Sequence, residues 1–106
     1  MKIFKLSSMF KGWFIGDFSP AVYKTNEFEV GIKYYKAGDN EPSHHHKIST
    51  EITVIVFGEA IMNNKTFRAG DIIIISPNES TNFIVKKDTC TVVVKFPSSN
   101  NDKYLD

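Results

Sequence analysis

The chain has 106 residues and a mass of 12.0 kDa, which is room for one domain. Thirteen basic and twelve acidic residues leave a net charge of +1, which gives no electrostatic basis for binding nucleic acid or an anionic membrane surface. No run approaches the ~20 apolar residues of a membrane helix, and we recognise no signal peptide. The single cysteine, Cys90, excludes an internal disulfide and fits a reducing compartment, so we expect a cytoplasmic protein.

Short strands follow one another along the chain. Residues 28–35 alternate, which places Phe28, Val30, Ile32 and Tyr34 on one face of a strand. Further strands are expected at residues 51–57, 60–62, 66–67, 72–75, 83–85 and 90–96. Turn signals separate them about every ten residues, among them Asn63–Lys65 and Lys87–Asp88. Short strands at this spacing are typical of an all-β sandwich or barrel.

Two of these strands, residues 52–57 and 72–75, are apolar on both faces. A strand with one wet face normally alternates, so four consecutive isoleucines indicate that both sides are covered. A second sheet of the same chain could provide the outer cover. A homodimer is the preferred interpretation, because so short a chain has little material to spare.

All three histidines stand together as His44-His45-His46, with Glu51 five residues after the last of them. On an extended strand His44 and His46 point to one side and His45 points away. A bend before Glu51 would bring its carboxylate to the same place. Two imidazoles and one carboxylate can hold a divalent metal such as Fe, Mn, Ni or Zn and leave positions open for water or substrate.

The flanking glycines complete a longer pattern, in which Gly38, His44, His46, Glu51 and Gly58 are separated by five, one, four and six residues. This pattern resembles the first signature motif of the cupins, and the resemblance covers residues 28–96. It implies an all-β double-stranded β-helix, or jelly-roll barrel, of two antiparallel sheets, frequently dimeric. We expect residues 1–106 to form a single cupin domain, with the N-terminal segment and the C-terminal tail packed on the barrel.

The second cupin motif is only partly matched. The segment from Gly70 to Pro77 resembles its opening, with one residue more than usual between the glycine and the proline. Glu79 stands where the resemblance predicts a glycine, and Asn82 stands where it predicts the histidine that is the fourth metal ligand. Asn82 is therefore a weak candidate ligand, binding through its amide oxygen.

Other polar residues are candidates for contacting a substrate. Thr53 shares a strand face with Glu51, together with Ile55 and Phe57, which predicts a pocket floor more apolar than polar. Lys33 and Tyr35 lie on the opposite side of their strand from the aliphatic residues. They could clamp an anion or act in acid–base chemistry, although solvent exposure is the more ordinary role for each.

Three functions remain open from the sequence. The first is an enzyme that acts on a small oxygen-rich molecule, either a carboxylate or carbohydrate-like, through its metal. Isomerase, lyase and dioxygenase chemistry all occur in similar proteins, and no catalytic residue can be singled out. The second is a cupin module that binds a metal or small ligand without turnover. The third is a purely structural dimer.

Overall fold

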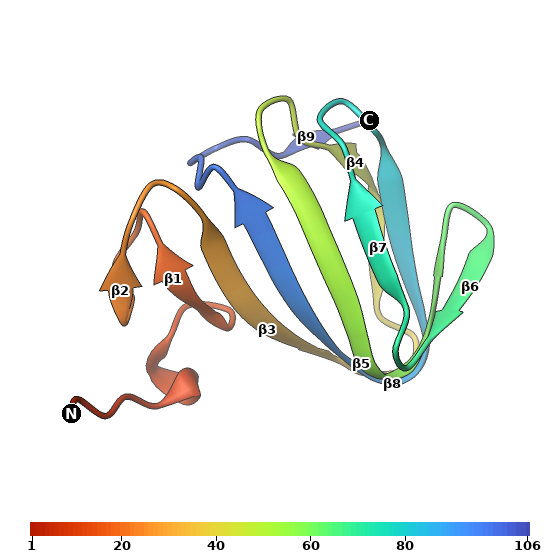
Figure 1. Cartoon of the computed structure of the whole chain (residues 1–106). Coiled ribbons are helices and arrows are strands. Elements are labelled where there is room, and N and C mark those ends of the chain that lie inside the picture. Colours follow the sequence, from red (N-terminus) through yellow and green to blue (C-terminus); the bar gives the residue numbers. More distant parts are fainter.

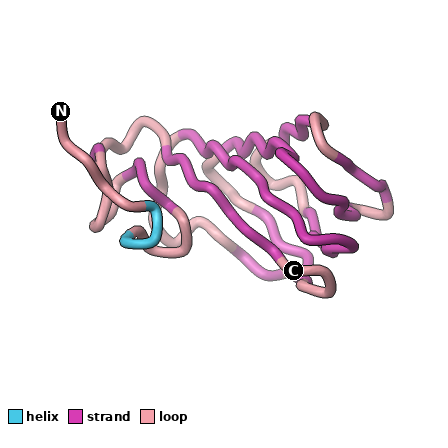
Figure 2. Tube along the Cα trace, turned by 90° about the horizontal axis from the view of Figure 1, so that it is seen from below, coloured by secondary structure: helices cyan, strands magenta, loops and turns pink.

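The computed structural model describes all 106 residues and consists almost entirely of strands. The strands are β1 (Trp13–Gly16), β2 (Tyr23–Lys24), β3 (Glu29–Tyr35), β4 (Asn40–His45), β5 (Thr50–Met62), β6 (Lys65–Arg68), β7 (Ile72–Ile75), β8 (Thr81–Phe96) and β9 (Tyr104–Leu105). The only helix is the three-residue 3-10 turn η1 (Leu6–Ser8), in the N-terminal segment that extends from one end of the strands (Figure 2). No helix of this chain could cross a bilayer.

The strands form two facing layers because β5 and β8 are long, bend sharply and run through both (Figure 1). The first layer has the order β2-β1-β3-β8-β5-β7, using the second half of β8 and the first half of β5. The second layer has the order β6-β5-β8-β4-β9, using the other halves. All pairings are antiparallel except that of β1 with β2.

The bend occurs where turns were expected to end strands. Gly58 adopts a φ of 102°, and a Cβ there would overlap the backbone and side chain of Thr89. Three register shifts between residues 55 and 60 accompany this close approach. The expected breaks after Phe57 and at Lys87–Asp88 are therefore wrong, since both strands continue through them. The expected turn at Asn63 is confirmed: it and its neighbour adopt the left-handed φ that asparagine tolerates.

The hydrophobic core lies between the two layers. Its buried members are Ile55, Ala60, Met62, Ile75, Phe83 and Val85. The ring of Phe83 contacts that of Tyr35 with the centroids 4.9 Å apart. Burying each of these side chains except that of Ala60 contributes about 1.5–3 kcal/mol, which holds the layers together.

The outer face of the first layer is a second apolar surface. Cross-strand pairing places eight aliphatic residues there in two rows, Val30–Val94–Ile52–Ile74 and Ile32–Val92–Val54–Ile72. The expectation that both sides of the isoleucine strand are covered is not met within one chain, because Ile72 and Ile74 are 68% and 63% exposed. The chain's own second layer lies on the opposite side.

Candidate functional site

A cavity of about 300 Å³ lies between the layers, at the small end of ligand-binding pockets. Sixteen residues line it and only five of them are hydrophobic, so the predicted apolar floor is wrong. Thr53 shares this interior with Glu51 as expected, but Phe57 does not, because the bulge at the bend turns it outward, where it is 47% exposed.

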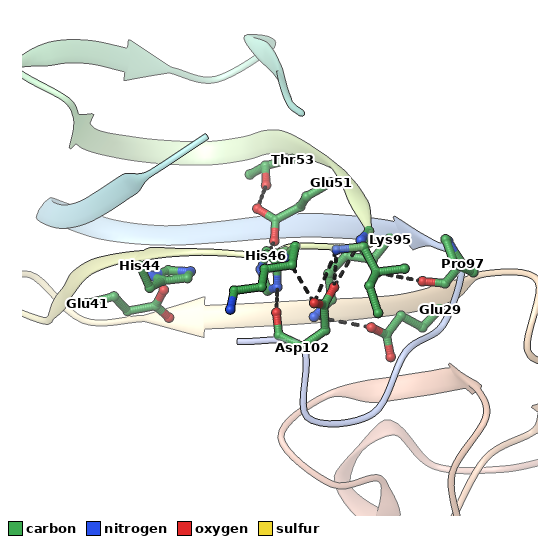
Figure 3. A network of polar contacts seen from close by, with 12 residues as sticks. Glu29, Glu41, His44, His46, Glu51, Thr53, Lys95, Pro97 and Asp102 are labelled. Atoms are coloured by element: carbon green, nitrogen blue, oxygen red, sulfur yellow. Dashed lines mark hydrogen bonds and ion pairs between the residues drawn. The ribbon is translucent and has the colours of Figure 1, made fainter. Parts of the chain in front are cut away.

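His46 and Glu51 face one another in this cavity (Figure 3). Nδ1 of His46 lies 2.8 Å from the carbonyl oxygen of Asp102. A carbonyl oxygen can only accept, so this nitrogen must carry the proton and Nε2 is left as the free nitrogen. Nε2 lies 3.6 Å from Oε1 of Glu51. A lone pair and a carboxylate at this spacing call for a proton or a metal cation between them.

His44 lines the same cavity at one side of this pair, and Figure 3 shows it near Glu41. Its Nδ1 donates to the carbonyl oxygen of Pro42 at 3.0 Å, which again leaves Nε2 free. The ring centroids of the two histidines are 5.6 Å apart. No three histidine, cysteine, aspartate or glutamate side chains are grouped closely enough in the structure to hold a metal ion.

The carboxylate of Glu51 is held ionised. Burial by itself would raise its pKa, but a proton held between Glu51 and His46, the positive charge of Lys95 and the hydroxyl of Thr53 outweigh burial and leave the pKa below its usual value. The Thr53 hydroxyl donates to Oε2 at 3.0 Å, which also fixes the orientation of the carboxylate. An oriented, ionised carboxylate is the form that binds a cation.

Asp102, in the C-terminal tail, supports this region, although no sequence pattern singled it out. Its carboxylate accepts hydrogen bonds from the backbone N–H groups of Lys47, Ile48 and Ser49 at 2.9–3.2 Å. Burial would raise the pKa of Asp102, but these bonds prevail and lower it. The tail therefore clamps the loop between β4 and β5, and its carbonyl orients His46.

His45 points away from the cavity, as the alternation of the strand predicted. Its Nδ1 lies 2.7 Å from a carboxylate oxygen of Asp106, and its ring stacks on Tyr104 at 5.5 Å. Hydrogen bonds from Ser43, Ser80 and His45 lower the pKa of Asp106 to about 2. His45 thus helps to dock the C-terminal tail.

Asn82 is not brought to the histidines. Its side-chain oxygen accepts a hydrogen bond of 2.8 Å from the backbone N–H of Asn63, in the turn between β5 and β6, and it does not line the cavity. Its neighbour Thr81 lines the cavity and is the register partner of His44. The expected register was therefore off by one residue, and a shift of one residue exchanges the two faces of a strand.

Lys33 and Tyr35 both line the cavity rather than facing solvent, since β3 turns its aliphatic residues outward and its polar ones inward. The Tyr35 hydroxyl donates to Oε1 of Glu41 at 3.1 Å. Burial and the nearby charge of Glu41 raise the pKa of Tyr35 well above its usual value, so its proton stays in place. That Glu41 lines the cavity was not predicted from the sequence. Glu41 lies three residues before His44, so the two would point to opposite faces of a regular strand, but a register shift between them in β4 brings both to the cavity.

Comparison with known proteins identifies the fold through solved structures rather than through sequence. No protein-family model and no curated protein matches the sequence. Among solved structures, the DMSP lyase DddQ from Ruegeria pomeroyi is similar with a TM-score of 0.72 and 18% identity, over 86% of this chain and 48% of that one. The chain thus spans about half the length of that lyase.

Two further structures are similar over more of their own length. An uncharacterized double-stranded β-helix protein from Klebsiella pneumoniae has a TM-score of 0.71 and 22% identity, over 98% of this chain and 90% of that one. KdgF from a Halomonas species has a TM-score of 0.66 and 13% identity, over 73% and 74% of the two chains. At these identities the likeness shows the fold, and the chain has the double-stranded β-helix fold of the cupins.

Proposed function

We propose that the chain binds a divalent metal ion through His44, His46 and Glu51 and acts as an enzyme on a small oxygen-rich molecule, either a carboxylate or carbohydrate-like. The observation that carries this proposal is the state of the two histidines. In both His44 and His46, Nδ1 donates to a backbone carbonyl and Nε2 is left free. Both histidines line the cavity that also contains the ionised carboxylate of Glu51.

The donor set fits a metal in chemistry and, for one pair, in spacing. Ligand atoms ~2.1 Å from a tetrahedral ion lie roughly 3.4 Å apart. Nε2 of His46 and Oε1 of Glu51 are 3.6 Å apart, which is compatible with a shared ion. Imidazole and carboxylate together suit Fe, Mn, Ni or Zn. His44, on β4 and two residues before His46, would be the third donor, and the two ring centroids are 5.6 Å apart.

Other residues of the chain orient two of these donor side chains. Asp102 orients the imidazole of His46, and Thr53 orients the carboxylate of Glu51. Glu51 contributes the only formal negative charge of the three donors. When bound, the ion would polarise a ligand oxygen or acidify a water molecule.

A non-catalytic module that binds a metal or small ligand is the second candidate. The absence of a grouped set of three donors favours a module that binds a small ligand without a metal, whereas the similarity to a lyase and to the polyketide cyclase RemF supports an enzyme. Incubating metal-loaded protein with a set of small carboxylic acids distinguishes the enzyme from the module. An enzyme would form a product that NMR detects, whereas a module would bind an acid and leave it unchanged.

The metal is tested by equilibrium dialysis of tag-free protein against Fe(II), Mn, Ni and Zn, followed by elemental analysis. We expect about one ion per chain, and His46→Ala should abolish binding. Thr81→His should tighten binding by adding an imidazole on the cavity side, whereas Asn82→His, one residue away on the other face, should not. Failure of all four metals to bind would refute the proposal.

We also propose that the chain is a homodimer through the aliphatic outer face of the first layer. Those two rows of valine and isoleucine carry no charge, so the face can meet a copy of itself without repulsion. Sedimentation equilibrium at micromolar concentration should give twice the chain mass, and Ile72→Lys with Ile74→Lys should give the monomer. A wild-type monomer at that concentration would contradict the dimer.

A further inference from the structure

We propose that the wall of the cavity formed by Lys33, Thr91 and Trp13 binds the carboxylate group of a small organic acid, so that the ligand is an anion rather than a neutral carbohydrate. This inference rests on the proposed function for the identity of the cavity as the binding site. It narrows the ligand class through residues outside the metal-ligand set.

The first support is the charge of the cavity. Four lysines line it (Lys11, Lys33, Lys95 and Lys103), against two carboxylates. The lining therefore carries a formal charge of +2, although the whole chain carries only +1. A concave site lined by one sign of charge concentrates ligands of the opposite sign.

The lysines are not fully compensated by the chain itself. Lys95 is paired with the buried Glu29 at 3.2 Å. Lys33 instead donates to the backbone carbonyl of Lys11 at 2.7 Å. Burial lowers the pKa of Lys33, and the charges of Lys11, Lys95 and Lys103 lower it further against the opposing effect of Glu41. An anion bound beside Lys33 would relieve this repulsion.

Thr91 provides the second, independent support. Its hydroxyl is the only buried side-chain polar atom in the structure without a hydrogen-bond partner. The residue is 1% exposed, lines the cavity and is the register partner of Lys33 on the neighbouring strand. An unpaired buried hydroxyl costs about 1–3 kcal/mol unless something accepts its proton. A carboxylate oxygen is an acceptor that would bind this hydroxyl and the Lys33 ammonium together.

Trp13 gives the wall its apolar part. Its ring lies against Gly31, where an added Cβ would come within 2.7 Å of the ring. The ammonium nitrogens of Lys33 and Lys95 lie 5.2 Å and 4.9 Å from the centroid of this ring. Lysine stems and an indole present apolar surface to the short carbon chain of an organic acid, while the charged tips meet its carboxylate.

Trp13 also makes the test direct, because it is the only tryptophan of the chain. Its fluorescence is measured during titration with succinate, with succinamide as a neutral probe of similar size, and with xylose as a neutral carbohydrate. Each titration is run on metal-free and on zinc-loaded protein. We expect succinate to change the fluorescence at concentrations at least about tenfold below those that succinamide or xylose requires.

Two variants separate ligand binding from folding. Lys33→Met should weaken succinate binding about tenfold, whereas Lys24→Met, on the exposed strand β2 and outside the cavity, should not. Thr91→Val keeps the shape of the side chain and removes the unpaired hydroxyl. It should leave stability in urea unchanged or higher, and weaken succinate binding severalfold. A hydroxyl with a purely structural role would move stability in the opposite direction and leave binding alone.

The outcomes are distinguishable from those for the proposed function. The carboxylate site is refuted if metal-free and zinc-loaded protein both bind succinate and succinamide equally, or if neither form binds succinate. It is also refuted if Lys33→Met binds succinate with unchanged affinity. If the chain binds succinate preferentially but binds none of the four metals, the carboxylate site is supported and the metal site is refuted. If the chain binds a metal but does not prefer succinate, the metal site is supported and the carboxylate site is refuted.

Discussion

The clamp made by Asp102 offers a direct test of how the C-terminal tail supports the site. Asp102→Ala removes an acceptor for three consecutive backbone N–H groups. Hydrogen bonds to a charged group contribute about 1.5–3 kcal/mol each. Lys47 and Ile48 are exposed, so water replaces much of what they lose, whereas Ser49 is 2% exposed and its N–H is left unpaired. We therefore expect a loss of about 3 kcal/mol for Asp102→Ala and roughly half of that for Asp102→Asn.

Urea unfolding of metal-free protein measures this loss as a lower midpoint with an unchanged slope. The matched control is Asp88→Ala, because the Asp88 carboxylate accepts a single exposed hydrogen bond from the N–H of Ala37. The control should lose less than about 1 kcal/mol. Asp102→Ala keeps the backbone carbonyl that accepts from Nδ1 of His46, but the tail that carries this carbonyl loses its anchor on the loop. Zinc affinity should therefore fall by up to about 10-fold. Equal stability losses for Asp102→Ala and Asp88→Ala would refute the clamp.

Three further predictions concern Asp102, Gly58 and Gly31. Because the pKa of Asp102 is lowered by folding, its contribution is complete above the unfolded pKa of about 3.9 and is lost as the pH falls through the lower folded value; wild type and Asp102→Asn should therefore converge in acid urea titrations, and a constant gap would contradict this. Gly58→Ala should cost about 3 kcal/mol by urea unfolding, because its positive φ and its approach to Thr89 both exclude a Cβ, and a loss under 1 kcal/mol would show that the bend relaxes. Gly31→Ala should displace the Trp13 ring and change its fluorescence maximum, and an unchanged spectrum would mean that the ring does not lie on β3.

The linear sequence was sufficient for the all-β fold, because alternation and turn residues are local signals. The turn at Asn63 and the opposed directions of His44 and His45 were predicted correctly for this reason. The spacing from Gly38 to Gly58 also indicated the cupin fold, which similarity to solved structures supports. What failed locally was the division of β5 and β8 into shorter strands, since a bulge resembles a turn in sequence.

Local sequence signals could not predict strand register or the contacts between residues distant in the chain. A shift of one residue decided that Thr81 rather than Asn82 faces the cavity, and the sequence on either side contains no signal that distinguishes the two. The choice of inner face on β3 was likewise made by packing: its aliphatic side went outward and Lys33 inward.

Residue types and local periodicity determined by themselves that this chain forms antiparallel strands and carries two imidazoles and a carboxylate close together along the chain. Only the tertiary structure decided that Asp102 orients His46 from 56 residues away, and that Lys33 of β3 and Lys95 of β8 lie over one tryptophan ring. The physical reason is that hydrogen bonds and Coulomb interactions act through space, so a partner distant in the chain leaves no mark on the local sequence.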